Sequence, residues 1–168
     1  MVRLRDATET SLPRRIAELI RDKDLAYSLV DLQAWAAKGD AAAFIALAHA
    51  FFYGGLGVDK NFTEAKRWLE RIDKANDHEG WASHRLGIIF YKGLTGPQDR
   101  RAAYKFFRRA TLRGNAKSRL ALAVMQKQGT GTLKKLKSSR ANFYRCSRSA
   151  EFNKIFRVYL AIESWLAK

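Results

Sequence analysis

Small and apolar residues recur along the chain at spacings of four and eight, which place their side chains on one face of an α-helix. The recurring set is an alanine, a leucine at +4, a small residue at +5, an aromatic residue at +8 and a glycine at +11. Two full copies are Ala43, Leu47, Ala48, Phe51 and Gly54, and Ala82, Leu86, Gly87, Phe90 and Gly93. A weaker third copy is Ala116, Leu120, Ala121 and Val124, with Lys127 at the glycine position. The pattern predicts three helices, each followed by a glycine-containing turn, and the small residue at +5 would let a neighbouring helix approach closely.

A second helix is predicted after each of these turns, because another apolar set recurs at a spacing of 38 residues. The first two copies are Ala65, Trp68, Leu69 and Ile72, and Ala103, Phe106, Phe107 and Ala110. The third copy keeps Ala141 and Tyr144 but has Arg145 and Arg148 in place of apolar partners. A helix pair that recurs in this way is typical of an α-solenoid.

Several short motifs resemble the Sel1-like repeats, which are relatives of the tetratricopeptide repeats. The motifs are Trp35 to Asp40, Gly55-Leu56-Gly57-Val58, Ala65 with Trp68, and Ala110-Thr111-Leu112-Arg113-Gly114. The resemblance covers about residues 31–148. It implies an all-α fold, a right-handed α-α superhelix of about three helix pairs.

The chain is predicted to form a single domain, residues 1–168, with atypical helices covering the two ends of the solenoid. Residues 1–40 would form N-terminal cap helices, beginning near Ser11, and a half repeat. Repeat 1 would span 41–80, repeat 2 would span 81–114, and a degenerate basic repeat 3 would span 115–149. Residues 150–168 would form a C-terminal capping helix, for which the alternative is a segment that binds a partner or a membrane surface.

The charge is strongly uneven along the chain. Thirty-two Lys plus Arg against sixteen Asp plus Glu give +16, of which residues 1–80 carry −1 and residues 81–168 carry +17. No carboxylate lies between Asp99 and Glu151. Folding does not require such an excess, because like charges repel in the compact state. The excess is either a solvated face or a docking surface for an anionic partner.

The residues predicted to form such a docking surface lie on the helix near 100–113 and in the basic stretch that follows repeat 2. They are Arg100, Arg101, Lys105, Arg108, Arg109, Arg113, Lys134, Lys135, Lys137, Arg140, Arg145 and Arg148. On the helix near 100–113, Arg101, Lys105, Arg108 and Arg109 fall broadly opposite the apolar face. One hypothesis is an acidic protein partner; the resemblance implies an adaptor, or an immunity protein that binds a toxin or effector. The alternative is nucleic acid held through its phosphates, with Phe143 and Tyr144 as the best candidates for base stacking.

No enzyme, cofactor or metal site is expected. His49, His78 and His84 show no metal-ligand spacing, and Cys146 has two arginines nearby but no histidine close in sequence. No apolar run is long enough to span a membrane, and the N-terminus lacks the apolar stretch of a secretion signal. A cytoplasmic location without a membrane partner is therefore expected.

Overall fold

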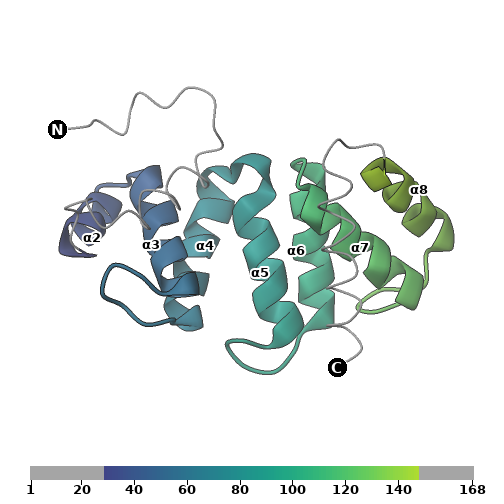
Figure 1. Ribbon diagram of the computed structural model, residues 1–168, viewed down its shortest axis with the longest axis horizontal. Helices are drawn as coiled ribbons and strands as arrows, with labels where there is room; N and C mark the ends of the chain where they lie inside the picture. The colour runs from purple at the N-terminus through teal and green to yellow at the C-terminus, as the bar shows by residue number, and fades with distance from the viewer. Residues whose placement is uncertain (1–28, 148–168) are drawn as a thin grey trace. The chain divides into compact units, whose positions relative to one another are not determined.

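The computed structural model describes residues 29–147, which form helices and turns with one isolated bridge between Gly55 and Val58 (Figure 1). This confirms the all-α helix-pair fold. The contacts divide the chain into two compact units, Met1–Asn76 and Asp77–Lys168, here called unit 1 and unit 2. The predicted helix near Ser11, the C-terminal capping helix and Arg148 lie outside the described residues.

Unit 1 contains helices α2 (Leu29–Ala37), α3 (Ala41–Tyr53) and α4 (Phe62–Asn76). The helix pair α3–α4 begins with polar caps, since Asp40 Oδ1 accepts hydrogen bonds from the amides of Ala42 and Ala43 at 2.7 and 3.1 Å. Asn61 Oδ1 accepts from the Glu64 amide at the start of α4. Such caps satisfy amides that have no partner within the helix. The predicted apolar residues Leu47, Ala65 and Leu69 are fully buried in this unit.

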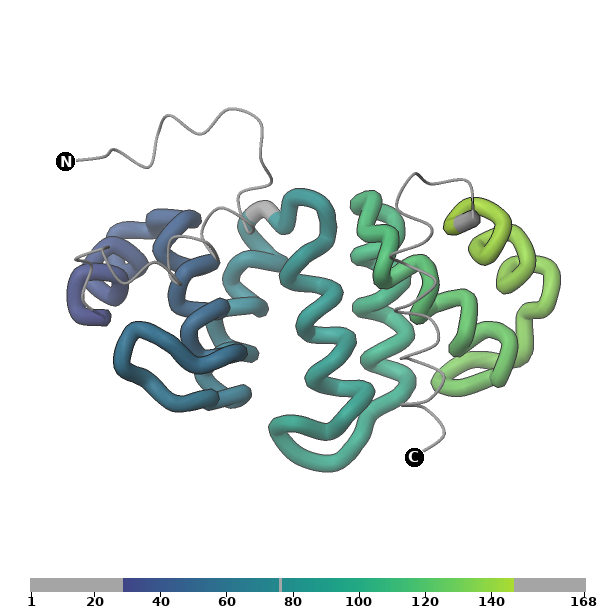
Figure 2. Tube along the Cα trace, viewed as in Figure 1, coloured from purple at the N-terminus to yellow at the C-terminus, as the bar shows by residue number. Residues whose placement is uncertain are grey.

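Unit 2 contains a short 3₁₀ helix, η1 (His78–Gly80), and then α5 (Trp81–Lys92), α6 (Arg100–Leu112), α7 (Ala116–Gln128) and α8 (Leu136–Ser147). Consecutive helices pack against one another. The chain reverses direction in the loop 93–99 between α5 and α6 (Figure 2). Each of the intervals 81–114 and 115–149 therefore contains one helix pair.

The small residue at +5 acts as predicted in α5. A Cβ placed on Gly87 would lie only 2.6 Å from Cε1 of Phe107, which is buried on α6. The two helices approach this closely because Gly87 has no side chain.

The predicted register of α8 is wrong. Ala141 and Tyr144 were expected to face the core, but both are exposed, and Ser139 and Cys146 are buried instead. The physical reason is the spacing between successive helix pairs. The amide of Ser139 bonds to Lys135 O at the start of α8, as the amide of Ala103 bonds to Asp99 O at the start of α6.

Corresponding positions in these two helices are consequently 36 residues apart, not 38. Ala103, Phe107 and Ala110 of α6 correspond to Ser139, Phe143 and Cys146 of α8. The turns 93–99 and 129–135 are equally long, so the difference arises earlier in the chain: α5 begins 19 residues after the start of α4 (62 to 81), whereas α7 begins 16 residues after the start of α6 (100 to 116). A shift of two residues turns a helix by about 200°, which exchanges its inner and outer faces.

Candidate docking surface

Helix α6 carries a basic outer face opposite a buried inner face, as its sequence predicts. Ala103, Phe107 and Ala110 are buried. The exposed basic residues are Arg100, Arg101, Lys105, Arg108 and Arg109, here called the α6 stripe. Because α6 contains no acidic residue, the stripe has no carboxylate of its own helix to neutralise it.

Local contacts position the stripe. Asp99 Oδ1 accepts a hydrogen bond from the Ala102 amide at 2.8 Å and so caps the helix. The guanidinium carbons of Arg100 and Arg109 lie 5.7 and 5.4 Å from the ring centroids of Tyr91 and Phe106. These cation–π contacts hold two of the arginines over aromatic rings that pack in the helix pair.

Arg113 does not belong to this outer face, although it was among the predicted partner-binding residues. Its Nη1 donates to Asp77 Oδ2 at 2.9 Å and to Ser83 Oγ at 2.7 Å. The buried Asp77 also accepts hydrogen bonds from the amides of Ala82 and Ser83. Arg113 therefore acts as a structural ion-pair partner, which links the end of α6 to the start of α5.

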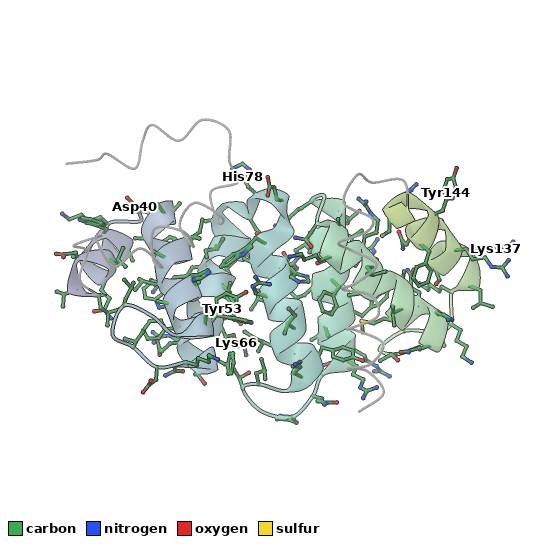
Figure 3. The ribbon with its side chains drawn as sticks, viewed as in Figure 1. Asp40, Tyr53, Lys66, His78, Lys137 and Tyr144 are labelled. Carbon is green, nitrogen blue, oxygen red and sulfur yellow. The ribbon has the colours of Figure 1, made fainter. Side chains whose placement is uncertain are left out.

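A second basic region follows α7. The exposed residues Lys134, Lys135, Lys137, Arg140 and Arg145 lie in the turn 129–135 and on α8. Lys137 and Tyr144 of α8 point away from the ribbon (Figure 3). Arg148, the last predicted member, is outside the described residues.

The turn 129–135 lies against the beginning of the α6 stripe. Gly131 adopts a φ of +68°, and a Cβ on it would collide with the carbonyl oxygen of Arg100. The turn is fixed to α7 by the Lys135 amide, which donates to Gln126 O at 2.9 Å. The two basic regions therefore meet at the Arg100 end of α6.

A polar chain also crosses the three helices of this region. Gln126 Nε2 donates to Tyr104 Oη at 3.3 Å, and Asn142 Nδ2 donates to Gln126 Oε1 at 3.0 Å. These bonds join α6, α7 and α8 beneath the basic residues. No local pattern in the sequence signals them, because the partners lie 22 and 16 residues apart.

Two exposed leucines were also missed by the sequence reasoning. The exposed fraction is 83% for Leu133 and 57% for Leu136. Both lie within the run Leu133-Lys134-Lys135-Leu136-Lys137. The available signal was the alternation of leucine with lysine in a stretch that matches no core position.

His84 and Cys146 are both buried in unit 2. His84 is buried with its Nδ1 2.7 Å from Ser118 Oγ, and burial lowers its pKa to about 3 with help from the charges of Arg85 and Lys117. Burial raises the pKa of the Cys146 thiol, against the influence of Arg119. Across the described helices there is no group of three or more His, Cys, Asp or Glu residues that could hold a metal ion. None of those helices is both long enough and apolar enough to cross a bilayer.

Two of the helix pairs match a known family of repeats. Residues 39–72 and 82–115 each match the family model of the Sel1 repeat. The chain therefore contains two Sel1 repeats. The family predicted from the sequence is thus confirmed. The first match contains α3 and most of α4, the second contains α5 from its second residue and all of α6, and α7–α8 lies beyond them.

Solved structures share the fold of this Sel1-like repeat protein. One is a protective antigen of uropathogenic Escherichia coli with an SLR fold, at a TM-score of 0.64 and 22% identity over 69% of this chain. This chain spans only 24% of that antigen. Another is a Sel1 repeat protein from Oxalobacter formigenes, at a TM-score of 0.61 and 23% identity, covering 75% of this chain and 94% of that one. No curated protein matches the chain. Sel1 repeats generally mediate protein–protein interactions and are generally non-catalytic.

Proposed function

We propose that this Sel1-like repeat protein is an adaptor or an immunity protein that docks an acidic protein partner, such as a toxin or effector, through unit 2. The observation that carries the proposal is the α6 stripe, in which Arg101, Lys105, Arg108 and Arg109 are exposed opposite a buried face and Arg100 is exposed at the start of the helix. Lys134, Lys135, Lys137, Arg140 and Arg145 would extend the contact.

The chemistry of the stripe supports a carboxylate-bearing partner. Four of its five residues are arginines, whose planar guanidinium groups pair bidentately with carboxylates. Opposite charges on the two surfaces would also speed association. Phosphates offer similar acceptors, so nucleic acid is the alternative that the experiment has to separate.

The test is an affinity pull-down from lysate of the native host, with and without nuclease. The test variant is Arg101→Glu with Arg108→Glu, since both side chains are exposed. The matched control is Lys60→Glu with Lys74→Glu, which makes the same change in net charge at exposed positions of unit 1.

We expect a stoichiometric acidic protein to co-purify with the chain after nuclease treatment. It should be lost with Arg101→Glu plus Arg108→Glu, here called the α6 variant, and retained by the control variant. Retention by the α6 variant would contradict the proposal. Recovery of nucleic acid alone, with every protein lost on digestion, would favour the phosphate alternative.

A further inference from the structure

The turn between α7 and α8 presents apolar and cationic side chains together at the surface. Leu133 and Leu136 are strongly exposed, and Lys134, Lys135 and Lys137 are exposed between and beside them. We call residues 133–137 the Leu–Lys tip. No acidic residue is present in the sequence for more than thirty positions before it or for more than ten after it, between Asp99 and Glu151.

The leucines are not what holds this turn in place. Its backbone is fixed by hydrogen bonds from the Thr130 amide to Met125 O at 3.0 Å and from the Lys135 amide to Gln126 O at 2.9 Å. Gly131 supplies the contact with the backbone of Arg100. A single exposed leucine such as Leu112 is ordinary, but two strongly exposed leucines three residues apart form a local apolar patch that points to a contact outside the chain.

We infer that the Leu–Lys tip docks on the surface of an anionic lipid bilayer. The two leucines enter the boundary between headgroups and acyl chains, and the lysines lie among the anionic headgroups. Lysine suits this position because its long apolar stem can lie beside the leucines while the ammonium group stays at the headgroups. The inference revises the expectation that the chain has no membrane partner.

Helix α8 extends the same surface. At 100° per residue, Lys137, Arg140 and Tyr144 fall on the side of α8 opposite Ser139 and Cys146, which are buried. The exposed fraction of Tyr144 is 62%. Tyrosine is enriched at membrane interfaces because its ring is apolar and its hydroxyl is polar.

Other partners fit this surface less well. Binding to nucleic acid through phosphates makes no use of two exposed leucines. A protein partner would need apolar pockets shaped for a projecting turn, whereas the interfacial region of a bilayer accepts apolar side chains without a preformed pocket. The composition also differs from that of the α6 stripe, where arginines dominate.

The test is co-sedimentation of the full chain with vesicles of phosphatidylcholine, with and without phosphatidylserine, at physiological ionic strength. The net charge of +16 by itself attracts the chain to anionic vesicles. The leucines are therefore the deciding residues. The test variant is Leu133→Ser with Leu136→Ser, and the control is Leu112→Ser, which alters a leucine with an exposed fraction of 75% on α6.

We expect the full chain to bind phosphatidylserine vesicles and the double leucine variant to bind them about tenfold more weakly. Leu112→Ser should leave the partition coefficient unchanged. Lys134→Glu with Lys135→Glu should weaken binding about tenfold or more, and more than Arg101→Glu with Arg108→Glu, which changes the net charge equally. Circular dichroism of each variant checks that the helices are retained.

Equal binding by the full chain and the leucine variant would overturn the inference, since charge alone would then explain the attraction. Absence of binding to phosphatidylserine vesicles would also overturn it. If the leucine variant instead lost the acidic protein in the pull-down, the tip would belong to the protein interface. The inference and the proposed function share Lys134, Lys135, Lys137 and Arg140 but fail separately. Retention of the acidic protein by the variant Arg101→Glu with Arg108→Glu contradicts the proposed function, whereas unchanged vesicle binding by the leucine variant contradicts the inference.

Discussion

Helices α6 and α8 occupy the same place in successive helix pairs, yet they begin and face solvent differently. Helix α6 starts after Asp99, whose carboxylate caps the first turn, whereas α8 starts after Lys135 at the corresponding position. A lysine has no acceptor for the first amides of a helix and places positive charge at the positive end of its dipole. The fold therefore tolerates at α8 a residue that disfavours the helix start.

The comparison separates the requirements of the core from those of the surface. Both helices bury a small residue, a phenylalanine and another small residue on their inner side, at Ala103, Phe107 and Ala110 in α6 and at Ser139, Phe143 and Cys146 in α8, although Phe143 is only partly buried. The outer faces differ: that of α6 is rich in arginine, whereas the start of α8 and the turn before it combine lysines with exposed leucines. Two kinds of contact can thus be built on one repeating scaffold.

The largest loss of stability should come from removing the ion pair between Asp77 and Arg113, which links the end of α6 to the start of α5. Asp77→Ala would remove the buried carboxylate that pairs with Arg113 and accepts from the Ser83 hydroxyl, and it would remove the cap from the amides of Ala82 and Ser83. We expect the free energy of unfolding to fall by about 3 kcal/mol, measured by urea denaturation. Asp99→Ala, which removes one cap, should cost about 1 kcal/mol. Equal losses from the two variants would show that the ion pair adds nothing to the capping of α5.

The packing of the third turn on α6 can be tested with two glycines of the same turn. Gly129 and Gly131 both adopt positive φ, +76° and +68°. A Cβ on Gly131 would meet the backbone of Arg100, whereas one on Gly129 would come closest to the flexible Lys134 side chain, at 3.0 Å from Cγ. We expect Gly131→Ala to lower the free energy of unfolding by about 3 kcal/mol and Gly129→Ala by about 1 kcal/mol. Similar losses in thermal or urea unfolding would mean that the turn does not lie against α6.

The stability of unit 2 should depend on pH through His84 of α5, whose ring contacts Ser118 of α7. Its pKa is about 3 in the folded chain and about 6.5 when unfolded, so below pH 6.5 the unfolded state binds a proton that the folded state does not. The stabilisation is present above pH 6.5 and is lost as the pH falls toward 3. We expect the free energy of unfolding to drop by about 2 kcal/mol between about pH 7 and pH 5. The variant His84→Asn should lose about 2 kcal/mol less stability over the same pH range. If its free energy of unfolding depended on pH as in the unmodified chain, His84 would not be the group responsible.

The smallest effect should come from exchanging the residues that begin the two helices. Lys135→Asp would supply the missing cap and favourable charge to α8, so we expect a gain of about 1 kcal/mol, seen as a rise in Tm. The reciprocal change, Asp99→Lys, should lower the stability by a similar amount. A Tm that does not rise with Lys135→Asp would show that the start of α8 is already satisfied by other groups. The same variant should bind phosphatidylserine vesicles more weakly, because it replaces a cation of the Leu–Lys tip with an anion.

The sequence by itself determined the features that depend on neighbours three or four residues away. Recurring Ala, Leu and aromatic positions predicted the helix pairs and their family, and the helical period predicted which side of α6 is buried at Ala103 and Phe107. The small residue at Gly87 predicted the close approach of α5 and α6. These features are local because a helix repeats every 3.6 residues whatever it packs against.

The tertiary structure decided what depends on the spacing of the helices and on distant partners. The shorter interval from the start of α6 to the start of α7 set the register of α8 and exposed Ala141 and Tyr144, which a fixed repeat spacing places on the inner side. Arg113 turned inward because Asp77, 36 residues earlier, lies buried within hydrogen-bonding distance. The contact of Gly131 with Arg100 brought the two basic regions together. Such contacts join residues far apart in sequence, so no local periodicity encodes them, and only the packing of α5 to α8 brings the partners within reach.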